Sequence, residues 1–178
     1  AREHTVDTVL MGYGGTRFAG GRAEGPIEEL AHDLPCDFLV LEDREFDTDE
    51  VLLPTAGGYS SDLSAEVAKL LRAEYGSDIT LLHVADSTAE GPEFLEGWAE
   101  SHGLADAELQ VETGDVEDAI ERASERCSMI VIGATEQGLL SRLVRGSLVL
   151  DVVEEVDCSV LLAERARKRG FLERLLGK

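Results

Sequence analysis

A glycine-bearing loop at residues 133–147 has the residue types that bind an anion. It reads Gly-Ala-Thr-Glu-Gln-Gly-Leu-Leu-Ser-Arg-Leu-Val-Arg-Gly-Ser and follows the apolar run Met-Ile-Val-Ile. Glycine lets the backbone approach a ligand closely, and the free N–H groups of a helix opening at Gly146 favour a phosphate there. The hydroxyl of Ser147 either caps that helix or donates to a phosphate oxygen. The alternative is a simple turn between a strand and a helix.

The rest of the chain from residue 45 alternates short apolar runs with helical patterns. The predicted strands cover residues 51–54, 79–84, 109–111, 129–132 and 159–162. The predicted helices begin at a Ser61 or Asp62 cap, near Phe94 with Leu95 and Trp98 on the same side, at an Asp115 cap, and at Ser147. Such alternation predicts an α/β fold with a doubly wound parallel sheet, whose ligands lie beyond the carboxyl ends of the strands. The loops after Pro54, Val84 and Ile132 are therefore the ones where we expect a ligand to bind.

An internal repeat indicates how the N-terminal region is organised. Residues 8–12 (TVLMG) resemble residues 130–133 (IVIG), and the next glycine follows thirteen residues later in both places, as Gly25 and Gly146. Further on, residues 34–41 (LPCDFLVL) resemble residues 156–162 (VDCSVLL) apart from one inserted residue. The repeat aligns Cys36 with Cys158, which would lie near each other if the last strands of the two repeats paired side by side.

The repeat divides the chain into three parts. Residues 1–44 read as the last two strands and last helix of a first repeat, and residues 45–164 as a complete second repeat. Half of a parallel sheet cannot bury both faces alone, so we expect the first repeat to be completed by a longer tandem protein or by another molecule. Residues 165–178 form a basic amphipathic tail, which either contacts a membrane surface weakly or is solvated. Its basic residues are Arg165, Arg167, Lys168, Arg169, Arg174 and Lys178.

The composition excludes several classes of function. The chain has 16 Lys and Arg against 37 Asp and Glu, giving a net charge of −21, which argues against a nucleic-acid partner. Acidic, lysine-poor composition is typical of a halophilic cytosol, where salt screens the repulsion between carboxylates. The three cysteines, Cys36, Cys127 and Cys158, have no disulfide or zinc spacing, which favours a reducing cytoplasm. Neither a membrane span nor a signal peptide is visible in the sequence.

On these motifs the chain resembles the universal stress protein (UspA) family. The nucleotide-binding branch of that family has Gly-x2-Gly-x9-Gly-Ser/Thr after its fourth strand, and Gly133 and Gly146-Ser147 keep this overall spacing. The segments Leu-Leu-His-Val at 81–84 and Gly-Asp-Val at 114–116 also match the family pattern. The resemblance implies a five-stranded, Rossmann-like parallel sheet of the adenine nucleotide alpha hydrolase type, plus a partial second copy.

The resemblance also implies a site for ATP, AMP or another adenine nucleotide. No catalytic residue and no metal are expected, beyond magnesium that accompanies the nucleotide. The implied nucleotide-binding residues are Pro54, Thr55, Ala56, Val84, Gly133, Ala134, Thr135, Gly138, Gly146, Ser147 and Leu148.

The chain departs from the family pattern at two positions of this site. Glu136 stands where the family has its middle glycine, and Ala56 stands where the family has an acidic residue that contacts the nucleoside. The surviving residues fit a modified nucleotide site, a smaller ligand, or no ligand. Two alternatives therefore stay open: a degenerate scaffold that only dimerises, and a weak nucleotide hydrolase. His83 lies inside an apolar strand and is read as a core or cleft-edge residue.

The tandem arrangement and the turn Pro-Thr-Ala-Gly-Gly at 54–58 look like the universal stress protein copies attached to archaeal amino-acid permeases. This resemblance implies a non-enzymatic, cytoplasmic regulatory module, which is either a separate protein or the cytoplasmic part of a membrane protein. Its implied partners are a membrane transporter domain and itself, as a homodimer or through pairing of the last strands of the two repeats.

Overall fold

The structure is a computed structural model of the chain, and it describes residues 6–12, 36–87, 89, 91–133 and 155–166. These residues form seven strands and three helices. In chain order they are β1 (Thr8–Gly12), β2 (Asp37–Glu42), β3 (Glu50–Pro54), α2 (Tyr59–Tyr75), β4 (Asp78–Ala85), α3 (Gly91–His102), β5 (Glu108–Thr113), α4 (Val116–Ser124), β6 (Met129–Gly133) and β7 (Ser159–Glu164).

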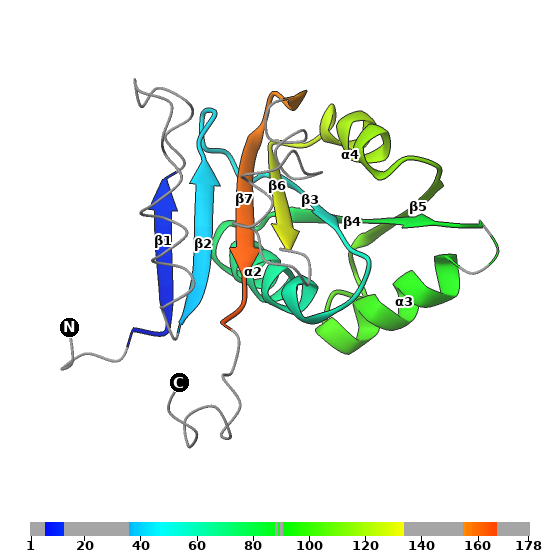
Figure 1. The fold of residues 1–178 in the computed structure, drawn as a ribbon, viewed down its shortest axis with the longest axis horizontal. Coiled ribbons are helices and arrows are strands. Elements are labelled where there is room, and N and C mark those ends of the chain that lie inside the picture. Colours follow the sequence, from blue (N-terminus) through cyan, green and yellow to red (C-terminus); the bar gives the residue numbers. More distant parts are fainter. Residues whose placement is uncertain (1–5, 13–35, 88, 90, 134–154, 167–178) are drawn as a thin grey trace, which may run out of the picture.

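All seven strands lie in one sheet with the order β1-β2-β7-β6-β3-β4-β5 (Figure 1). From β7 to β5 every neighbouring pair is parallel, which confirms the predicted five-stranded parallel sheet. β1 and β2 are parallel to each other and extend this sheet, with β2 antiparallel to β7. The last strands of the two predicted repeats thus pair with each other within one chain.

The β2–β7 pair is symmetric about its centre. Val40 lies opposite Leu162, which is the equivalent residue of the other repeat. On one side of this centre, Phe38 lies opposite Glu164. On the other side, their equivalents in the other repeat, Val160 and Glu42, lie opposite each other. The two repeats are therefore related by a local two-fold axis that passes between Val40 and Leu162.

The ends of this pair are fastened by two equivalent hydrogen bonds. The backbone N–H of Arg44 donates to Ser159 Oγ at 3.0 Å, and that of Ala166 donates to Asp37 Oδ1 at 2.8 Å. The antiparallel register also places Cys36 and Cys158 beyond opposite ends of the pair. The expectation that strand pairing would bring these two thiols together is wrong, because the two-fold axis sends equivalent residues to opposite ends.

The core lies in two layers on the two faces of the sheet. On one face α2 and α3 cover side chains such as Leu53, Val131 and Leu161. On the other face α4 contributes Ile120, which belongs to a cluster with Leu162. Strands β3, β4, β6 and β7 supply buried side chains to both clusters, as expected for parallel strands covered on both faces.

The helix starts follow local backbone chemistry. Asp115 caps α4 as predicted, because its carboxylate accepts hydrogen bonds from the N–H groups of Glu117 and Asp118. The predicted cap of α2 at Ser61 or Asp62 is wrong, since the helix begins at Tyr59 after Gly58, whose φ is 93°. Ser61 Oγ instead donates to the carbonyl of Gly57 at 3.1 Å.

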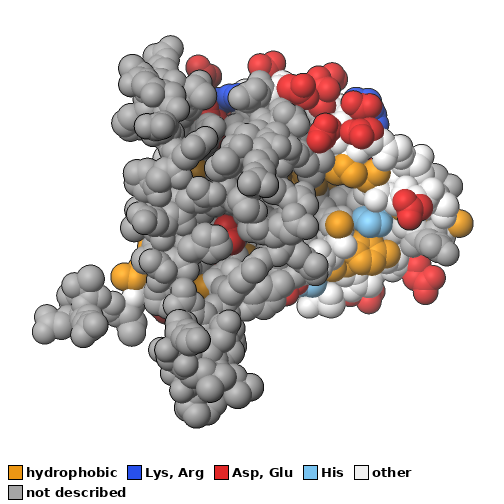
Figure 2. Space-filling view, viewed as in Figure 1, with side chains coloured by type: hydrophobic (Ala, Val, Ile, Leu, Met, Phe, Trp, Pro, Cys, Tyr) orange, Lys and Arg blue, Asp and Glu red, His pale blue; other side chains and the backbone are white. Residues whose placement is uncertain are grey.

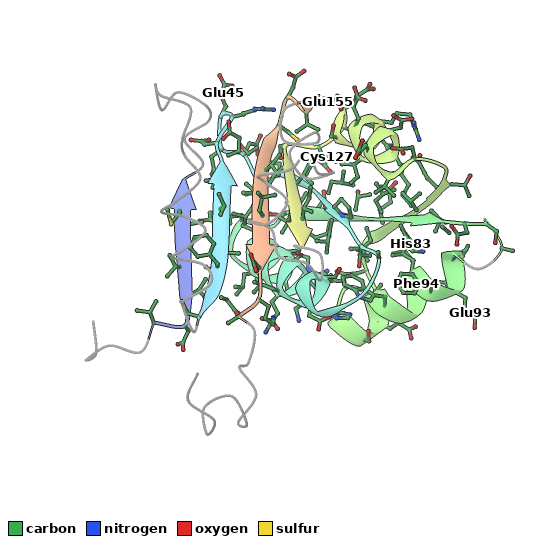
Figure 3. All side chains as sticks on the ribbon, in the orientation of Figure 1. Glu45, His83, Glu93, Phe94, Cys127 and Glu155 are labelled. Atoms are coloured by element: carbon green, nitrogen blue, oxygen red, sulfur yellow. The ribbon has the colours of Figure 1, made fainter. Side chains whose placement is uncertain are left out.

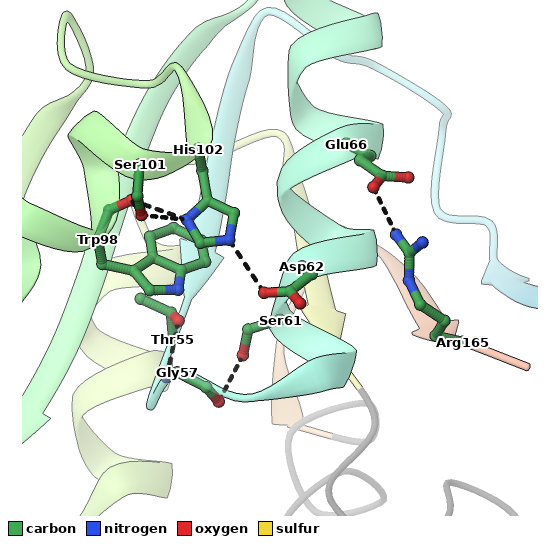
Figure 4. Close-up of polar contacts among 9 residues, drawn as sticks. All are labelled: Thr55, Gly57, Ser61, Asp62, Glu66, Trp98, Ser101, His102 and Arg165. Atoms are coloured by element: carbon green, nitrogen blue, oxygen red, sulfur yellow. Dashed lines mark hydrogen bonds and ion pairs between the residues drawn. The ribbon is translucent and has the colours of Figure 1, made fainter. Parts of the chain in front are cut away.

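Helices α2 and α3 are joined by a histidine (Figure 4). Each ring nitrogen of His102 faces an acceptor: Nδ1 lies 2.8 Å from the carbonyl of Trp98, and Nε2 lies 2.9 Å from Asp62 Oδ1 on α2. The imidazole stacks on the indole of Trp98, with ring centroids 4.1 Å apart. This contact fixes the spacing of the two helices that cover one face of the sheet. Among the described helices, none is long and apolar enough to cross a membrane.

Candidate functional site

The carboxyl ends of β3, β4 and β6 meet at one edge of the sheet. β3 lies between the other two, with Pro54 opposite Leu82 of β4. Continuing the two registers brings Ala56 level with Val84, and Thr55 level with Gly133 at the end of β6. Five of the predicted site residues lie in described segments: Pro54, Thr55, Ala56, Val84 and Gly133. The sheet brings them together at the edge where parallel sheets bind ligands.

The turn after β3 is held in place by backbone hydrogen bonds. The N–H of Thr55 donates to the carbonyl of Leu82 at 2.8 Å, and Thr55 Oγ1 accepts from the N–H of Gly57 at 3.1 Å. Thr55 is buried and Ala56 is exposed at the tip. Gly57 and Gly58 have φ values of 77° and 93°, a region that favours glycine. The turn therefore presents a rigid backbone beside the strand ends.

His83 of β4 supports this turn from the side. Its Nδ1 lies 2.9 Å from the carbonyl of Thr55, so this nitrogen carries the proton and donates. The imidazole contacts the ring of Phe94 on α3, with centroids 4.4 Å apart (Figure 3). His83 is half-buried, and its assignment as a core or cleft-edge residue stays a prediction.

The sequence did not identify Phe94 as part of this region. The sequence predicts Phe94 on the same side of its helix as Leu95 and Trp98, which are buried, whereas Phe94 is 37 % exposed and packs beside the turn. A Cβ added at Gly57 would lie 3.3 Å from Phe94 Cζ, so the turn and the phenyl ring are in close contact. Figure 2 shows hydrophobic side chains around a histidine in the part of the molecule where Figure 3 labels His83 and Phe94.

The other predicted site residues lie outside the described residues. They are Ala134, Thr135, Gly138, Gly146, Ser147 and Leu148. Glu136 and most of the basic tail, residues 167–178, lie outside as well. Arg165 of the tail is described, and its Nη2 forms an ion pair with Glu66 Oε1 at 2.7 Å (Figure 4). In the segments that the structure covers, no group of acidic, histidine or cysteine residues is arranged to hold a metal ion.

The cysteines form a separate group of titratable residues. Burial raises the pKa of the Cys127 thiol to about 11, and the neighbouring Cys158 adds to this shift. Burial also raises the pKa of Cys158 and of Cys36. Since the thiolate is the reactive form, these thiols are held in their unreactive state.

We predict that Cys127 reacts slowly with thiol reagents while the protein is folded. At pH 8 its thiolate fraction should be about 100-fold below that of the unfolded chain, because its pKa is raised to about 11. The unfolded chain loses this proton at a lower pH than the folded chain does. The raised pKa therefore contributes to the free energy of unfolding below about pH 9, and this contribution is lost as the pH rises to 11. Labelling followed by peptide mapping measures the rate at Cys127, with the urea-unfolded chain as control. Equal rates in the two states would contradict the prediction.

Comparisons with known proteins agree with this architecture. The model of the universal stress protein family matches residues 99–164. A universal stress protein from Archaeoglobus fulgidus is similar in structure, with a TM-score of 0.63, 20 % identity, and coverage of 80 % of this chain and 54 % of that chain. A protein described as a putative universal stress protein from Pseudomonas aeruginosa has a TM-score of 0.62 and 17 % identity, over 96 % of this chain and 68 % of that one.

A third solved structure, a universal stress protein in complex with cAMP, has a TM-score of 0.56 and 19 % identity, over 66 % of this chain and 98 % of that one. No curated protein matches the chain. The chain spans about half the length of the Archaeoglobus protein. The described residues thus have the α/β fold of the universal stress proteins.

Proposed function

We propose that this chain is a universal stress protein module that binds an adenine nucleotide at the carboxyl ends of β3, β4 and β6. The observation that carries the proposal is that the neighbouring parallel strands β3, β4 and β6 end at one sheet edge, at Pro54, Ala85 and Gly133. The turn after β3 is fixed by its bond to Leu82, so its backbone is preorganised for a ligand. The spacing from Gly133 to Gly146-Ser147 in the sequence supports a phosphate subsite beside it.

The similar structure that contains cAMP supports the choice of an adenine nucleotide as ligand. The proposed module is non-enzymatic and cytoplasmic, and it responds to ligand by a shift between conformations. In this proposal it regulates a membrane transporter of the amino-acid permease type, a role that rests on the sequence resemblance alone. Incubation with ATP should release no ADP or phosphate above the buffer control.

A second candidate function is a scaffold that pairs repeats without a ligand. The observation that favours it is the β2–β7 pair, whose ladder and end bonds are formed between residues of the two repeats. The scaffold and the nucleotide module differ in one measurable property, which is the binding of a nucleotide.

Titration with ATP, AMP, cAMP and cyclic dinucleotides at high salt separates these functions. High salt is needed because the net charge of −21 repels an anionic ligand. We expect a Kd of about 10 µM, equivalent to about −6.8 kcal/mol, for at least one adenine nucleotide. Calorimetry measures the Kd, and the rise in Tm on adding ligand checks it independently. Absence of binding at millimolar nucleotide would contradict the nucleotide module and favour the scaffold function.

A pair of glycine variants tests the position of the site. Gly57→Ala strains a φ of 77° and presses on Phe94, so it should weaken nucleotide binding about tenfold. Gly76→Ala is the matched control, because Gly76 has a φ of 80° at the end of α2, away from the strand ends that form the site. Both variants should lose some stability, but only Gly57→Ala should change the Kd. Equal Kd values in the two variants would place the site elsewhere.

A further inference from the structure

The edge strand β1 carries an exposed apolar surface. Leu10 is 61 % exposed, and its register partner Leu39 on β2 is half-buried on the same face, together with Leu41. We call this surface, made of the outer edge of β1 in the described sheet and the side chains of Leu10, Leu39 and Leu41, the open β1 edge. In Figure 1 β1 lies at the end of the sheet farthest from β5. An apolar surface of this kind at a sheet edge marks an interaction site.

The second repeat shows what covers the equivalent surface. β6 is the counterpart of β1, and Val131, Leu161 and Ala163 are the counterparts of Leu10, Leu39 and Leu41. Val131 and Ala163 are 0 % exposed and Leu161 is 7 % exposed. They are covered because β3 pairs with the other edge of β6 in parallel and α2 packs over β6 and β7. Among the described residues, β1 has neither a strand at its outer edge nor a helix over Leu10.

The two edges of the sheet differ in their protection against pairing. β5 carries Glu108 and Glu112, and Glu112 forms an ion pair with Arg122 at 2.6 Å. Charged side chains of this kind prevent an edge strand from pairing with another chain. β1 reads Thr-Val-Leu-Met-Gly and has no charged residue in a chain of which 30 % is charged. The open β1 edge thus lacks the protection that the opposite edge has.

We propose that the open β1 edge binds a strand–helix unit of a partner polypeptide that has the pattern of this chain's own β3 and α2. The partner strand is apolar, runs parallel to β1 and lies opposite Thr8 and Val9, as Val51 and Leu52 lie opposite the counterparts of those residues in β6. The helix that follows lies over Leu10 and Leu39 and removes them from water. This surface is separate from the proposed nucleotide site and does not depend on it.

A peptide with the sequence of residues 49–76 is the probe for this surface, because it carries the β3 and α2 pattern. It is added to the full chain at high salt, and amide hydrogen exchange is followed in residues 6–12. We expect saturable binding that slows exchange in β1 at least tenfold, together with a gain of helical circular dichroism by the peptide. A peptide carrying Leu52→Asp and Leu53→Asp should not bind, since its strand can no longer be buried.

Matched variants of the two edges locate the binding. Leu10→Lys adds a charge on β1, and because Leu10 is exposed the protein should fold normally; peptide binding should weaken at least tenfold. Leu109→Lys makes the same change on the other edge strand, at a residue that is 37 % exposed, and should leave binding unchanged.

Three outcomes would overturn the proposal. The first is no protection of β1 by the peptide, and the second is equal binding to the two variants. The third is a dimer of the chain, seen by light scattering without peptide and abolished by Leu10→Lys, which would make a second molecule of this chain the occupant.

Discussion

Leu162→Ala is expected to lower the free energy of unfolding by about 2–5 kcal/mol. Leu162 is 2 % exposed and lies on the local two-fold axis, opposite Val40 and within the core cluster that contains Ile120. Truncation leaves a cavity where the two repeats meet, and β-strands on both sides limit how far the surroundings can close it. Urea unfolding at constant salt measures the loss.

The control for this prediction is Leu70→Ala. Leu70 is 63 % exposed on α2, so its truncation should change stability by no more than about 0.5 kcal/mol. Because Leu162 and Phe38 of the first repeat belong to the same core cluster, probes in β2 and in α4 should report one shared transition in both proteins. A loss below about 1 kcal/mol in Leu162→Ala would show that this interface is not tightly packed.

Trp98→Ala should cost about 3–5 kcal/mol of stability. The indole is 8 % exposed, lies between α2 and α3, and stacks on His102, which in turn binds Asp62. Removing the indole leaves a large cavity and frees the imidazole that joins the two helices. Urea unfolding again measures the loss, and it is followed by circular dichroism because the variant lacks the tryptophan.

Trp98→Phe is the informative comparison. It keeps an aromatic ring against His102 and removes the indole N–H, which is buried without a hydrogen-bond partner in the described part of the chain. The loss should therefore be well below that of Trp98→Ala, since an unpartnered buried donor is itself costly. Equal losses in the two variants would indicate that indole size, and not the ring contact, determines the stability.

Much of the fold is predictable from local sequence patterns. The run Met-Ile-Val-Ile at 129–132 is apolar and β-branched and forms the buried strand β6, and Asp115 caps its helix because an aspartate at that position accepts two N–H groups. The parallel order follows from the alternation of strands and helices. Pairing of the last strands of the two repeats is one of the two arrangements that the family resemblance implies, the other being a homodimer. Each of these signals lies within a few residues of the feature it predicts.

The errors come from features that depend on distant residues or on competing local signals. Ser61 and Asp62 have good capping side chains, but the positive φ of Gly58 starts α2 earlier, at Tyr59. The apolar pattern groups Phe94 with Leu95 and Trp98 on one side of the helix, although Phe94 is partly exposed next to His83 and the turn after β3. The hydrogen bond between Asp62 and His102 joins residues of two helices, so no local pattern in either helix indicates it.

The antiparallel joining of β2 and β7 has a consequence for communication between the repeats. Strands β6 and β7 run one way and β1 and β2 run the other, so the carboxyl ends of β6 and β1 point toward opposite edges of the sheet. Among the described residues, the β2–β7 ladder, with Val40 and Leu162 at its midpoint, lies between these two ends. Because both repeats contribute a strand to this one ladder, we expect a change at one end to be transmitted to the other through it.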